Sequence, residues 1–572
     1  GLGDVYKRQG RYTIPLTGGG WSLWLDKEAS WQNDRLYLPH EITDLSLLPV
    51  NVPTGGWQTL SHNPDAVPVE VPGTVEEYLT VTDNPRPENF RGVSWWYRKI
   101  TIPADQQKKR FIIYFESVRM RAEVYLDGKL VAYDLIGETP FHVDITDEAK
   151  PGKEQLLAIR VTNPGGNFHW QDFDIMKWGE YNIPPSRSFT GIIGRVRLES
   201  VNPVFISDIY MQNTPELTKV NAILSFTNET SSSVKQDVEL IVNEKVNPDK
   251  VVFRQTLKAI SFPAGNHEVT IPVNVPDAKL WDLSTPELYT CNVLIKKGKK
   301  TLDQDKKDFG FRWFTVDGVG KDAVLRLNGR RIMLRSAISW GYFPVTGLIA
   351  TTEMAEKQVR TAKSLGLNML NFHRCIGSPV VLEKADELGL LYYEEPGSFH
   401  SANHDPFIRT IVNEKLKRMV YRDRSHPSLV IFNLINEFGG PLSQDKALVA
   451  KRMNDMREAH AIDPSRIMSF TSGWAGSEDK EEDSKAHMLP FDTTLYRKGW
   501  YDNHRAGGPE TWVENYYKGP KDNIMYTSNR TEVYLRGEEG AISTPPRIQM
   551  IYDQIKSTGK TCLLYTSDAA DD

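Results

Sequence analysis

The sequence predicts a multidomain fold, in which two β-sandwiches precede a barrel of alternating strands and helices. Its 572 residues are too many for a single hydrophobic core, so several domains are expected. Up to about residue 313, short strands alternate with turn signals. Past Phe314, apolar strands alternate with helical stretches instead. This change in the pattern of predicted strands and helices separates an all-β part from an α/β part.

The first sandwich is expected over residues 10–203. Short runs rich in β-branched and aromatic residues, such as Phe111–Phe115 and Ala122–Leu126, are typical of strands and are separated by turn signals. The dipeptide Asp127-Gly128 is a strong hairpin signal. Since no long amphipathic helix interrupts the stretch, a β-sandwich of the jelly-roll kind is predicted.

The second sandwich is expected over residues 204–313. Polar breaks at Asn228–Ser233 and Asn247–Lys250 divide its strands, and turns recur at the spacing of an immunoglobulin-like β-sandwich.

The α/β part is expected over residues 314–560. Apolar strands buried on both faces are typical of parallel sheets, so a (β/α)₈ TIM barrel is predicted, with a doubly wound sheet as the alternative. Arg331–Arg335 is interpreted as the first strand, and Leu429–Ile435 is a later one, followed by a helix over 444–461. About seven strands can be counted, fewer than the eight of this fold, so the barrel is expected to be C-terminally truncated.

The two ends are interpreted separately. Residues 1–9 and 561–572 resemble translated sequencing-adapter scars and are excluded from fold reasoning. We therefore expect the natural protein to be longer at both ends, which leaves localisation open and makes a periplasmic or secreted protein plausible. An incomplete barrel has open strand edges, so the chain as given is expected to aggregate or to be inactive.

Composition excludes several classes of protein. The net charge of -5 carries no basic block for nucleic acid or membrane surfaces, and no apolar run is long enough to span a membrane. The three cysteines are far apart, so neither a disulfide framework nor a zinc site is predicted. The 14 tryptophans would suit a sugar-binding surface, although most are expected in the core.

Two carboxylates follow apolar strands of the predicted barrel. Glu437 comes after Asn436 at the end of LVIFNLIN, and Glu538-Glu539 follows the strand TEVYL. The C-terminal ends of barrel strands carry the reacting groups of such enzymes. Glycoside hydrolysis needs two carboxyl groups, one to protonate the leaving oxygen and one to attack or to activate water. Each residue alone could equally be a helix-start carboxylate or a solvated acidic turn.

Several motifs together resemble glycoside hydrolase family 2, the group of β-galactosidases, β-glucuronidases and β-mannosidases. The likeness runs from about Gly20 to Pro546. The segments that carry it are Gly92–Pro103, Ala122–Ala132, Thr139–Thr146 and Ser188–Leu198 in the first sandwich, Lys279–Thr290 and Phe309–Phe314 in the second, and Leu325–Ala337 and Tyr421–Glu437 in the barrel.

The resemblance implies a role for each strand-end residue. Glu437 takes the position of the general acid/base, and Asn436 that of the residue that hydrogen-bonds the sugar 2-hydroxyl. By spacing, Glu538 is the nucleophile. Glu539 stands where the family usually has an aromatic residue, and it is the alternative nucleophile.

Further substrate contacts are expected around the barrel mouth. Arg374 follows the second strand, where it could hold the nucleophile ionised, although the order of residues here departs from the family's usual one. Asp172, with Asp174 as the alternative, resembles the loop by which the first domain reaches the barrel. The other candidates are His373, Trp474, His487, Tyr496 and Trp500.

The resemblance implies a retaining exo-β-glycosidase that acts by double displacement on carbohydrate. A β-galactoside is the favoured substrate, with β-glucuronides and β-mannosides as alternatives. No cofactor is needed, no metal ligand is assigned, no nucleic acid or membrane partner is expected, and metal dependence and a homo-oligomer stay open. The rival class is a non-catalytic carbohydrate-binding protein.

Overall fold

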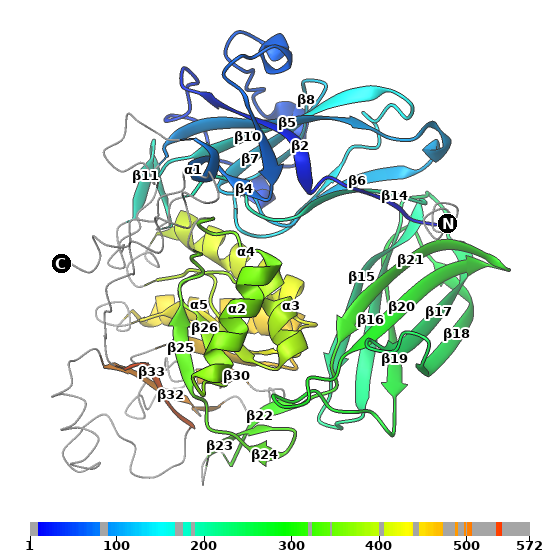
Figure 1. Cartoon of the computed structure of the whole chain (residues 1–572), viewed down its shortest axis with the longest axis vertical. Helices are drawn as coiled ribbons and strands as arrows, with labels where there is room; N and C mark the ends of the chain where they lie inside the picture. Colours follow the sequence, from blue (N-terminus) through cyan, green and yellow to red (C-terminus); the bar gives the residue numbers. More distant parts are fainter. Residues whose placement is uncertain are drawn as a thin grey trace.

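The computed structural model describes residues 10–79, 90–165, 175–184, 189–318, 323–343, 346–399, 405–438 and 445–472 in full, and the backbone alone of the strands between 487 and 539. Figure 1 shows two β-sandwiches and an α/β body beside them, with the first sandwich (blue to cyan) lying over both of the others. No helix in the described ranges is both long enough and apolar enough to cross a membrane.

The first domain is a sandwich of two antiparallel sheets. Its elements are β1 (Tyr12–Pro15), β2 (Gly18–Asp26), β3 (Val67–Val71), β4 (Gly73–Thr74), α1 (Val75–Tyr78), β5 (Gly92–Thr101), β6 (Arg110–Phe115), β7 (Arg121–Leu126), β8 (Lys129–Asp134), β9 (Phe141–Asp144), β10 (Glu154–Asn163), β11 (Met176–Trp178), β12 (Tyr181–Ile183), β13 (Gly191–Ile192) and β14 (Val196–Val201). Strand order is β3-β2-β5-β10-β7-β8 in one sheet and β1-β14-β6-β9 in the other. An apolar core with members from both sheets fills the space between them.

The predicted hairpin of this domain is confirmed. Strands β7 and β8 pair antiparallel across Asp127 and Gly128, whose φ angles are 48° and 84°. Both residues are left-handed, as the tight two-residue turns of twisted hairpins require.

The second domain is also a sandwich. Its strands are β15 (Val204–Asn213), β16 (Lys219–Asn228), β17 (Val234–Glu244), β18 (Val251–Phe262), β19 (Gly265–Asn274), β20 (Tyr289–Lys297) and β21 (Lys300–Phe309). They form a β15-β16-β19 sheet and a β18-β17-β20-β21 sheet around one apolar core. The two polar breaks predicted from the sequence fall between strands.

The segment that leads into the barrel differs from the prediction. Arg331–Arg335 does not form the first barrel strand: Arg330–Arg331 (β24) instead pairs back onto Val324–Leu327 (β23), next to β22 (Phe314–Asp317). The physical reason is the turn at Asn328 and Gly329, which have φ angles of 51° and 78° and reverse the chain. The first parallel strand is therefore β25 (Ser336–Ser339).

The third domain alternates strands and helices as predicted. After β25 come α2 (Thr352–Ser364), β26 (Met369–Phe372), α3 (Pro379–Leu388), β27 (Leu391–Glu394), α4 (Pro406–Asp423), β28 (Leu429–Asn436), α5 (Lys446–Ile462) and β29 (Ile467–Ser472). Strands β25 to β29 are parallel neighbours in that order. Buried residues of all four helices belong to a single apolar cluster with the strands. Helices on one face of a parallel sheet favour the barrel over the doubly wound alternative.

The sheet continues beyond β29 in a different manner. Strand β30 (His487–Leu489) pairs antiparallel with β29, and β31 (Arg497–Lys498) pairs with β30. Strands β32 (Trp500–Arg505) and β33 (Val533–Glu539) form a separate parallel pair. Within the described strands, β25 has a neighbour on one side only.

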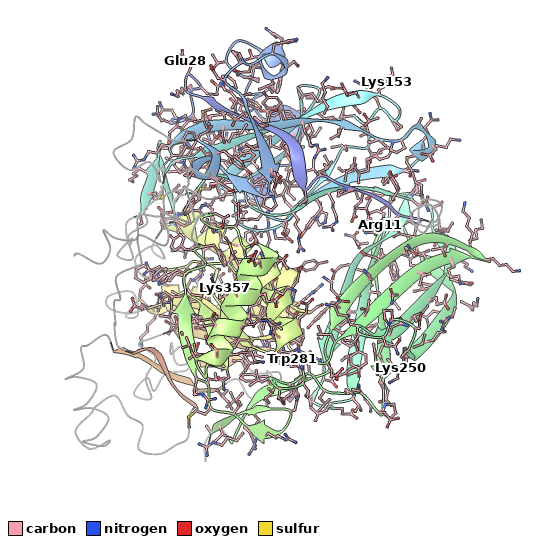
Figure 2. All side chains as sticks on the ribbon, viewed as in Figure 1. Arg11, Glu28, Lys153, Lys250, Trp281 and Lys357 are labelled. Carbon is pink, nitrogen blue, oxygen red and sulfur yellow. The ribbon has the colours of Figure 1, made fainter. Side chains whose placement is uncertain are left out.

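A buried arginine joins the two sandwiches. Figure 2 shows Arg11 at the junction of the first and second domains. Its guanidinium contacts Asp303 and Asp305 of β21 at 3.0 and 3.1 Å, and Glu199 of β14 at 3.0 Å. Arg11 therefore contacts three carboxylates from two domains, one of which, Glu199, also pairs with Arg197 at 2.7 Å.

The second sandwich is anchored to the barrel by polar contacts of buried side chains. Trp281, which Figure 2 shows at this junction, donates its indole N–H to the carbonyl of Asp386 at 2.8 Å. Arg312 donates to the carbonyls of Pro427 at 3.0 Å and Leu429 at 2.8 Å. These two carbonyls lie at the start of β28, so the second domain fixes the strand that leads to Glu437.

Candidate active site

The candidate site begins at the end of β28. All eight residues of this strand are buried, and the next residue, Glu437, is only partly buried. Glu437 has a φ of 51°, a left-handed conformation that costs a non-glycine residue roughly 1–2 kcal/mol. Its backbone N–H donates to the carbonyl of Ser472 at 2.8 Å. The end of the neighbouring strand β29 thus holds the turn that carries this carboxylate, and strain of this kind is concentrated at functional sites.

Asn436 is fully buried beside Glu437. Its backbone N–H donates to the carbonyl of Ser398 at 2.9 Å, and its Nδ2 donates to Ser472 Oγ at 2.8 Å. Among the described residues, no donor reaches its Oδ1. A buried acceptor without a partner is costly, so this oxygen is a candidate contact for a bound hydroxyl group.

Glu395, directly after β27, is a second buried carboxylate at this end of the sheet. It accepts hydrogen bonds from the backbone N–H of Arg374 at 2.7 Å, from Ser472 Oγ at 2.8 Å and from Asn433 Nδ2 at 3.3 Å. The ends of β26, β27, β28 and β29 are therefore linked through one side chain.

Its neighbour Glu394 contacts a different set of groups. Glu394 accepts from the backbone N–H of Gly377 at 2.7 Å, and Arg422 of α4 lies 3.4 Å away. Burial, helped by the nearby Asp423 carboxylate, raises the pKa of Glu394 well above its usual value. Glu394 is thus a structural carboxylate behind the sheet.

His373 and Arg374, both predicted as substrate contacts, follow β26. His373 is buried, with its ring edge-on to Trp340 at 4.7 Å between centroids. The Arg374 guanidinium lies 3.8 Å from the ring centroid of Phe399 and 5.3 Å from that of Trp340. This arginine is therefore held by two aromatic rings at the same edge as Glu395.

Several residues of the motif Tyr421–Glu437 make hydrogen bonds to neighbouring elements of the barrel domain. His426 Nδ1 contacts Asp386 of α3 at 2.5 Å, and Asp386 also accepts the backbone N–H of Ser428 at 3.0 Å. Arg466 donates to the carbonyl of His426 at 2.6 Å. The motif thus sets where β28 starts relative to α3 and β29.

The remaining predicted residues are described in part or not at all. The side chains of Glu538 and Glu539 lie outside the described residues, but their backbones end β33 and pair with His504 and Arg505 of β32. For His487 and Trp500 the backbone of β30 and β32 is likewise described. Asp172, Asp174, Trp474 and Tyr496 lie outside the described residues.

Three residues of the site were missed in the sequence: Trp340 after β25, Glu395 after β27 and Ser472 at the end of β29. Glu395 directly follows the buried strand β27, as Glu437 follows β28, so the same rule could have found it. Trp340 follows the Ser-Ala-Ile-Ser strand β25 and Ser472 is itself the last residue of β29, so neither carries that signal. In the fully described part of the chain, no three His, Cys, Asp or Glu side chains gather closely enough to hold a metal ion.

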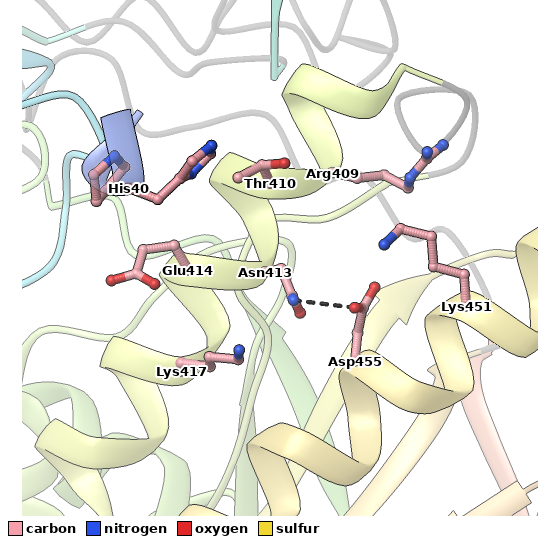
Figure 3. A pocket seen from close by; sticks show the side chains of 9 residues that line it. His40, Arg409, Thr410, Asn413, Glu414, Lys417, Lys451 and Asp455 are labelled. Atoms are coloured by element: carbon pink, nitrogen blue, oxygen red, sulfur yellow. Dashed lines mark hydrogen bonds between the residues drawn. The ribbon is translucent and has the colours of Figure 1, made fainter. Parts of the chain in front are cut away.

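A separate surface hollow lies on the outer side of the barrel. Figure 3 shows it between α4, α5 and His40 of the first domain, with Asn413 hydrogen-bonded to Asp455 at 3.1 Å. Its volume is about 220 Å³, and Lys417 and Lys451 are among its charged lining residues. Because helix faces rather than strand ends line it, this hollow is distinct from the site of Glu437.

Family comparison covers most of the chain. Residues 19–182 match the sugar binding domain of glycosyl hydrolases family 2, residues 204–312 match its central domain, and residues 321–527 match its TIM barrel domain. The chain therefore belongs to glycosyl hydrolases family 2, whose members are glycoside hydrolases. The match to the barrel ends before Glu538.

The curated relatives are named after two different activities. A β-galactosidase from Thermoanaerobacterium thermosulfurigenes is 30% identical over 377 residues, which are 64% of this chain and 49% of the relative. A β-glucuronidase from Formosa agariphila is 24% identical over 360 residues, which are 60% of this chain and 36% of the relative. The chain spans about half or less of the length of these proteins.

Solved structures agree on the fold. A family 2 member from Bacteroides cellulosilyticus has a TM-score of 0.64 at 20% identity, covering 80% of this chain and 57% of the other. A β-glucuronidase from Parabacteroides merdae has a TM-score of 0.62 at 22% identity, covering 81% and 57%. The architecture of two sandwiches and a TIM barrel is thus shared.

Proposed function

We propose that this chain carries the catalytic glutamates of a retaining exo-β-glycosidase. Glu437 is the general acid/base, and Glu538 is the nucleophile, with Glu539 as the alternative. The observation that carries the proposal is the strained Glu437 directly after the buried Asn436, at the C-terminal end of a barrel strand in a family 2 chain. Asn436 Oδ1 is a free acceptor within the described residues, which suits a sugar hydroxyl.

The proposed reaction is a double displacement. Glu538 attacks the anomeric carbon while Glu437 protonates the departing glycosidic oxygen, giving a covalent glycosyl-enzyme and a free alcohol. Glu437 then takes a proton from water, which attacks the anomeric carbon and releases both the sugar and Glu538. The two carboxyl groups of a retaining site stand roughly 5–5.5 Å apart.

A β-galactoside is the proposed substrate. Support comes from the β-galactosidase names of two relatives that are 30% and 29% identical to this chain. A β-glucuronide is the second candidate, because other relatives are named β-glucuronidases. A β-mannoside remains the third. A non-catalytic carbohydrate-binding protein is the alternative from another class.

The proposal is tested on a full-length version of the protein, by hydrolysis of aryl β-galactosides, β-glucuronides and β-mannosides by the wild type and by Glu437→Gln. Removing the acid should lower kcat/KM about 10²- to 10⁴-fold on phenyl glycosides, whose leaving group needs a proton. The loss should be far smaller on 2,4-dinitrophenyl glycosides, whose leaving group departs as an anion.

The control is Glu353→Gln, which changes an exposed carboxylate in the first turn of α2 and should leave both rates unchanged. Equal losses on the two leaving groups would refute the acid/base role of Glu437. Sugar binding without any hydrolysis by the wild type would favour the non-catalytic alternative.

A further inference from the structure

The side chain of Asn436 has two ends with different surroundings. Nδ2 is bonded to Ser472 Oγ at 2.8 Å, whereas within the described residues Oδ1 has no donor. The amide is fully buried, so one of its two orientations must be imposed by its neighbours. Which orientation is imposed decides whether the site offers an acceptor or a donor to a ligand.

Ser472 settles this orientation. Its hydroxyl donates to Glu395 Oε1 at 2.8 Å, and a hydroxyl group has only one proton to donate. The single hydroxyl proton of Ser472 is thus committed to Glu395. Ser472 Oγ can then only accept from Asn436, which requires Nδ2 at that position and leaves Oδ1 free.

Glu395 is itself held in its acceptor role. The backbone N–H of Arg374 donates to its Oε2 at 2.7 Å, and Asn433 Nδ2 lies 3.3 Å from its Oε1. Asn433 is oriented in turn, because Ser469 Oγ donates to its Oδ1 at 2.6 Å. Each member of this buried chain of hydrogen bonds therefore has a defined direction.

We propose that Glu395 and Ser472 form a positioning relay that fixes the amide of Asn436 with its oxygen toward the sugar. The inference rests on the proposed function. The relay makes the site demand a hydroxyl that can donate, and it rejects sugars in which this hydroxyl is replaced by hydrogen. Through its backbone carbonyl, Ser472 also holds the N–H of Glu437, so one residue aligns both members of the Asn436–Glu437 pair.

The relay is tested with paired substrates that differ in one hydroxyl group. The probes are 4-nitrophenyl β-D-galactoside and its 2-deoxy counterpart, assayed with the wild type and with Ser472→Ala. The variant should lose about 10- to 100-fold in kcat/KM on the galactoside, the effect of disordering one buried polar contact, and less than about threefold on the 2-deoxy substrate. Equal losses on both substrates would overturn the relay, because a merely structural serine affects them alike.

A matched control is Ser465→Ala. Ser465 is a buried serine just before β29 that donates to a buried carboxylate, Asp463 Oδ1, at 2.6 Å. Its removal should not change the ratio of the two rates. Asn436→Ala is the second variant. When Asn436 is already alanine, the further change Ser472→Ala should no longer alter the ratio of kcat/KM on the galactoside to kcat/KM on the 2-deoxy substrate. Independent effects of the two changes on this ratio would contradict the relay.

Binding separates this inference from the proposed function. Calorimetric titration with D-galactose and 2-deoxy-D-galactose should show that the wild type prefers galactose and that Ser472→Ala loses the preference. If the wild type binds with this preference but hydrolyses nothing, the proposed function fails and the relay stands. If the wild type shows no preference for the sugar that bears the hydroxyl group over its deoxy counterpart, in binding or in hydrolysis, the relay is wrong.

Discussion

Glu76 in the short helix α1 is a carboxylate whose ionisation is governed by burial. It is 4% exposed and accepts the backbone N–H of Thr190 at 3.0 Å, yet burial raises its pKa to about 8. A carboxyl whose folded pKa is raised holds more protons in the folded than in the unfolded state. The free energy of unfolding should therefore fall as the pH rises from about 4.5, the unfolded value, to about 8.

We expect Glu76→Gln to remove this pH dependence. The amide oxygen can still accept from Thr190, and no charge remains to be buried. The variant should be at least as stable as the wild type at pH 8 and within about 1 kcal/mol of it at pH 5. Thermal unfolding at both pH values measures the difference. The control Glu70→Gln, on the exposed side of β3, should change stability by less than about 0.5 kcal/mol at either pH. A variant less stable than the wild type at pH 8 would contradict the role given to burial.

At this same scale, the sequence predicts some site residues and not others. Glu437 and Asn436 can be recognised from the sequence alone, because a carboxylate directly after a long apolar strand is a local pattern. Glu395 follows a buried strand of only four residues, and Ser472 has no such signal in the sequence. Their importance comes from contacts between strands that lie far apart in the chain, and only the fold brings Ser472 to 2.8 Å from both Glu395 and Asn436.

Among the elements, β28 depends on how α3 holds its beginning. His426, just before this strand, contacts Asp386 of α3. Burial by itself lowers the pKa of His426, but the Asp386 carboxylate outweighs burial and the pKa is raised. A histidine with a raised folded pKa contributes stability that is complete below its unfolded pKa of about 6.5. That contribution is lost as the pH rises through the folded pKa.

Asp386→Asn should therefore destabilise the protein more at pH 6 than at pH 9. The expected cost at pH 6 is about 1–3 kcal/mol, since a buried imidazolium loses its charged partner while the bond from Ser428 N–H can persist. Denaturant unfolding at the two pH values provides the measurement. The variant His62→Gln, which alters an exposed histidine, should show no such difference. An equal cost at both pH values would mean that the charge of His426 does not stabilise this junction.

Helix and strand positions follow from the sequence wherever the apolar period is clear. The helix predicted over 444–461 is found at Lys446–Ile462, where the Asp445 side chain caps the start by accepting from the backbone N–H of Leu448. The prediction that the run Arg331–Arg335 forms the first barrel strand is wrong. The left-handed pair Asn328-Gly329 folds that run back as a hairpin, and this turn signal outweighs the apolar pattern.

For the whole molecule, Arg11 decides how the two sandwiches meet. Burial, with help from Glu199 and Asp303, raises the pKa of Asp305 although Arg11 lies beside it. Arg11→Met would leave Asp303 and Asp305 without their arginine partner, while Glu199 would keep its contact with Arg197 at 2.7 Å. Breaking a buried ion pair in this way costs about 3–5 kcal/mol. The cost should be larger at pH 8 than at pH 5, where the carboxylates take up protons.

Scanning calorimetry at the two pH values tests this prediction. Arg326→Met is the control, because Arg326 pairs with Asp317 on the surface and its loss should cost less than about 1 kcal/mol. If both variants lower the melting temperature equally, the junction does not depend on the buried charge of Arg11.

Arg312 bears on how this chain could be divided or recombined. It belongs to the end of the second sandwich, yet it supplies donors to the carbonyls of Pro427 and Leu429 at the start of the strand that leads to Glu437. A barrel excised at residue 314 would lose both donors, and the carbonyl of Leu429 would keep only its hydrogen bond from Arg466 Nε at 2.7 Å. Exchange of the barrel between relatives should therefore carry Arg312 along, with the joint placed before Gly310. The segment that must be exchanged together with β28 is therefore larger than the barrel itself.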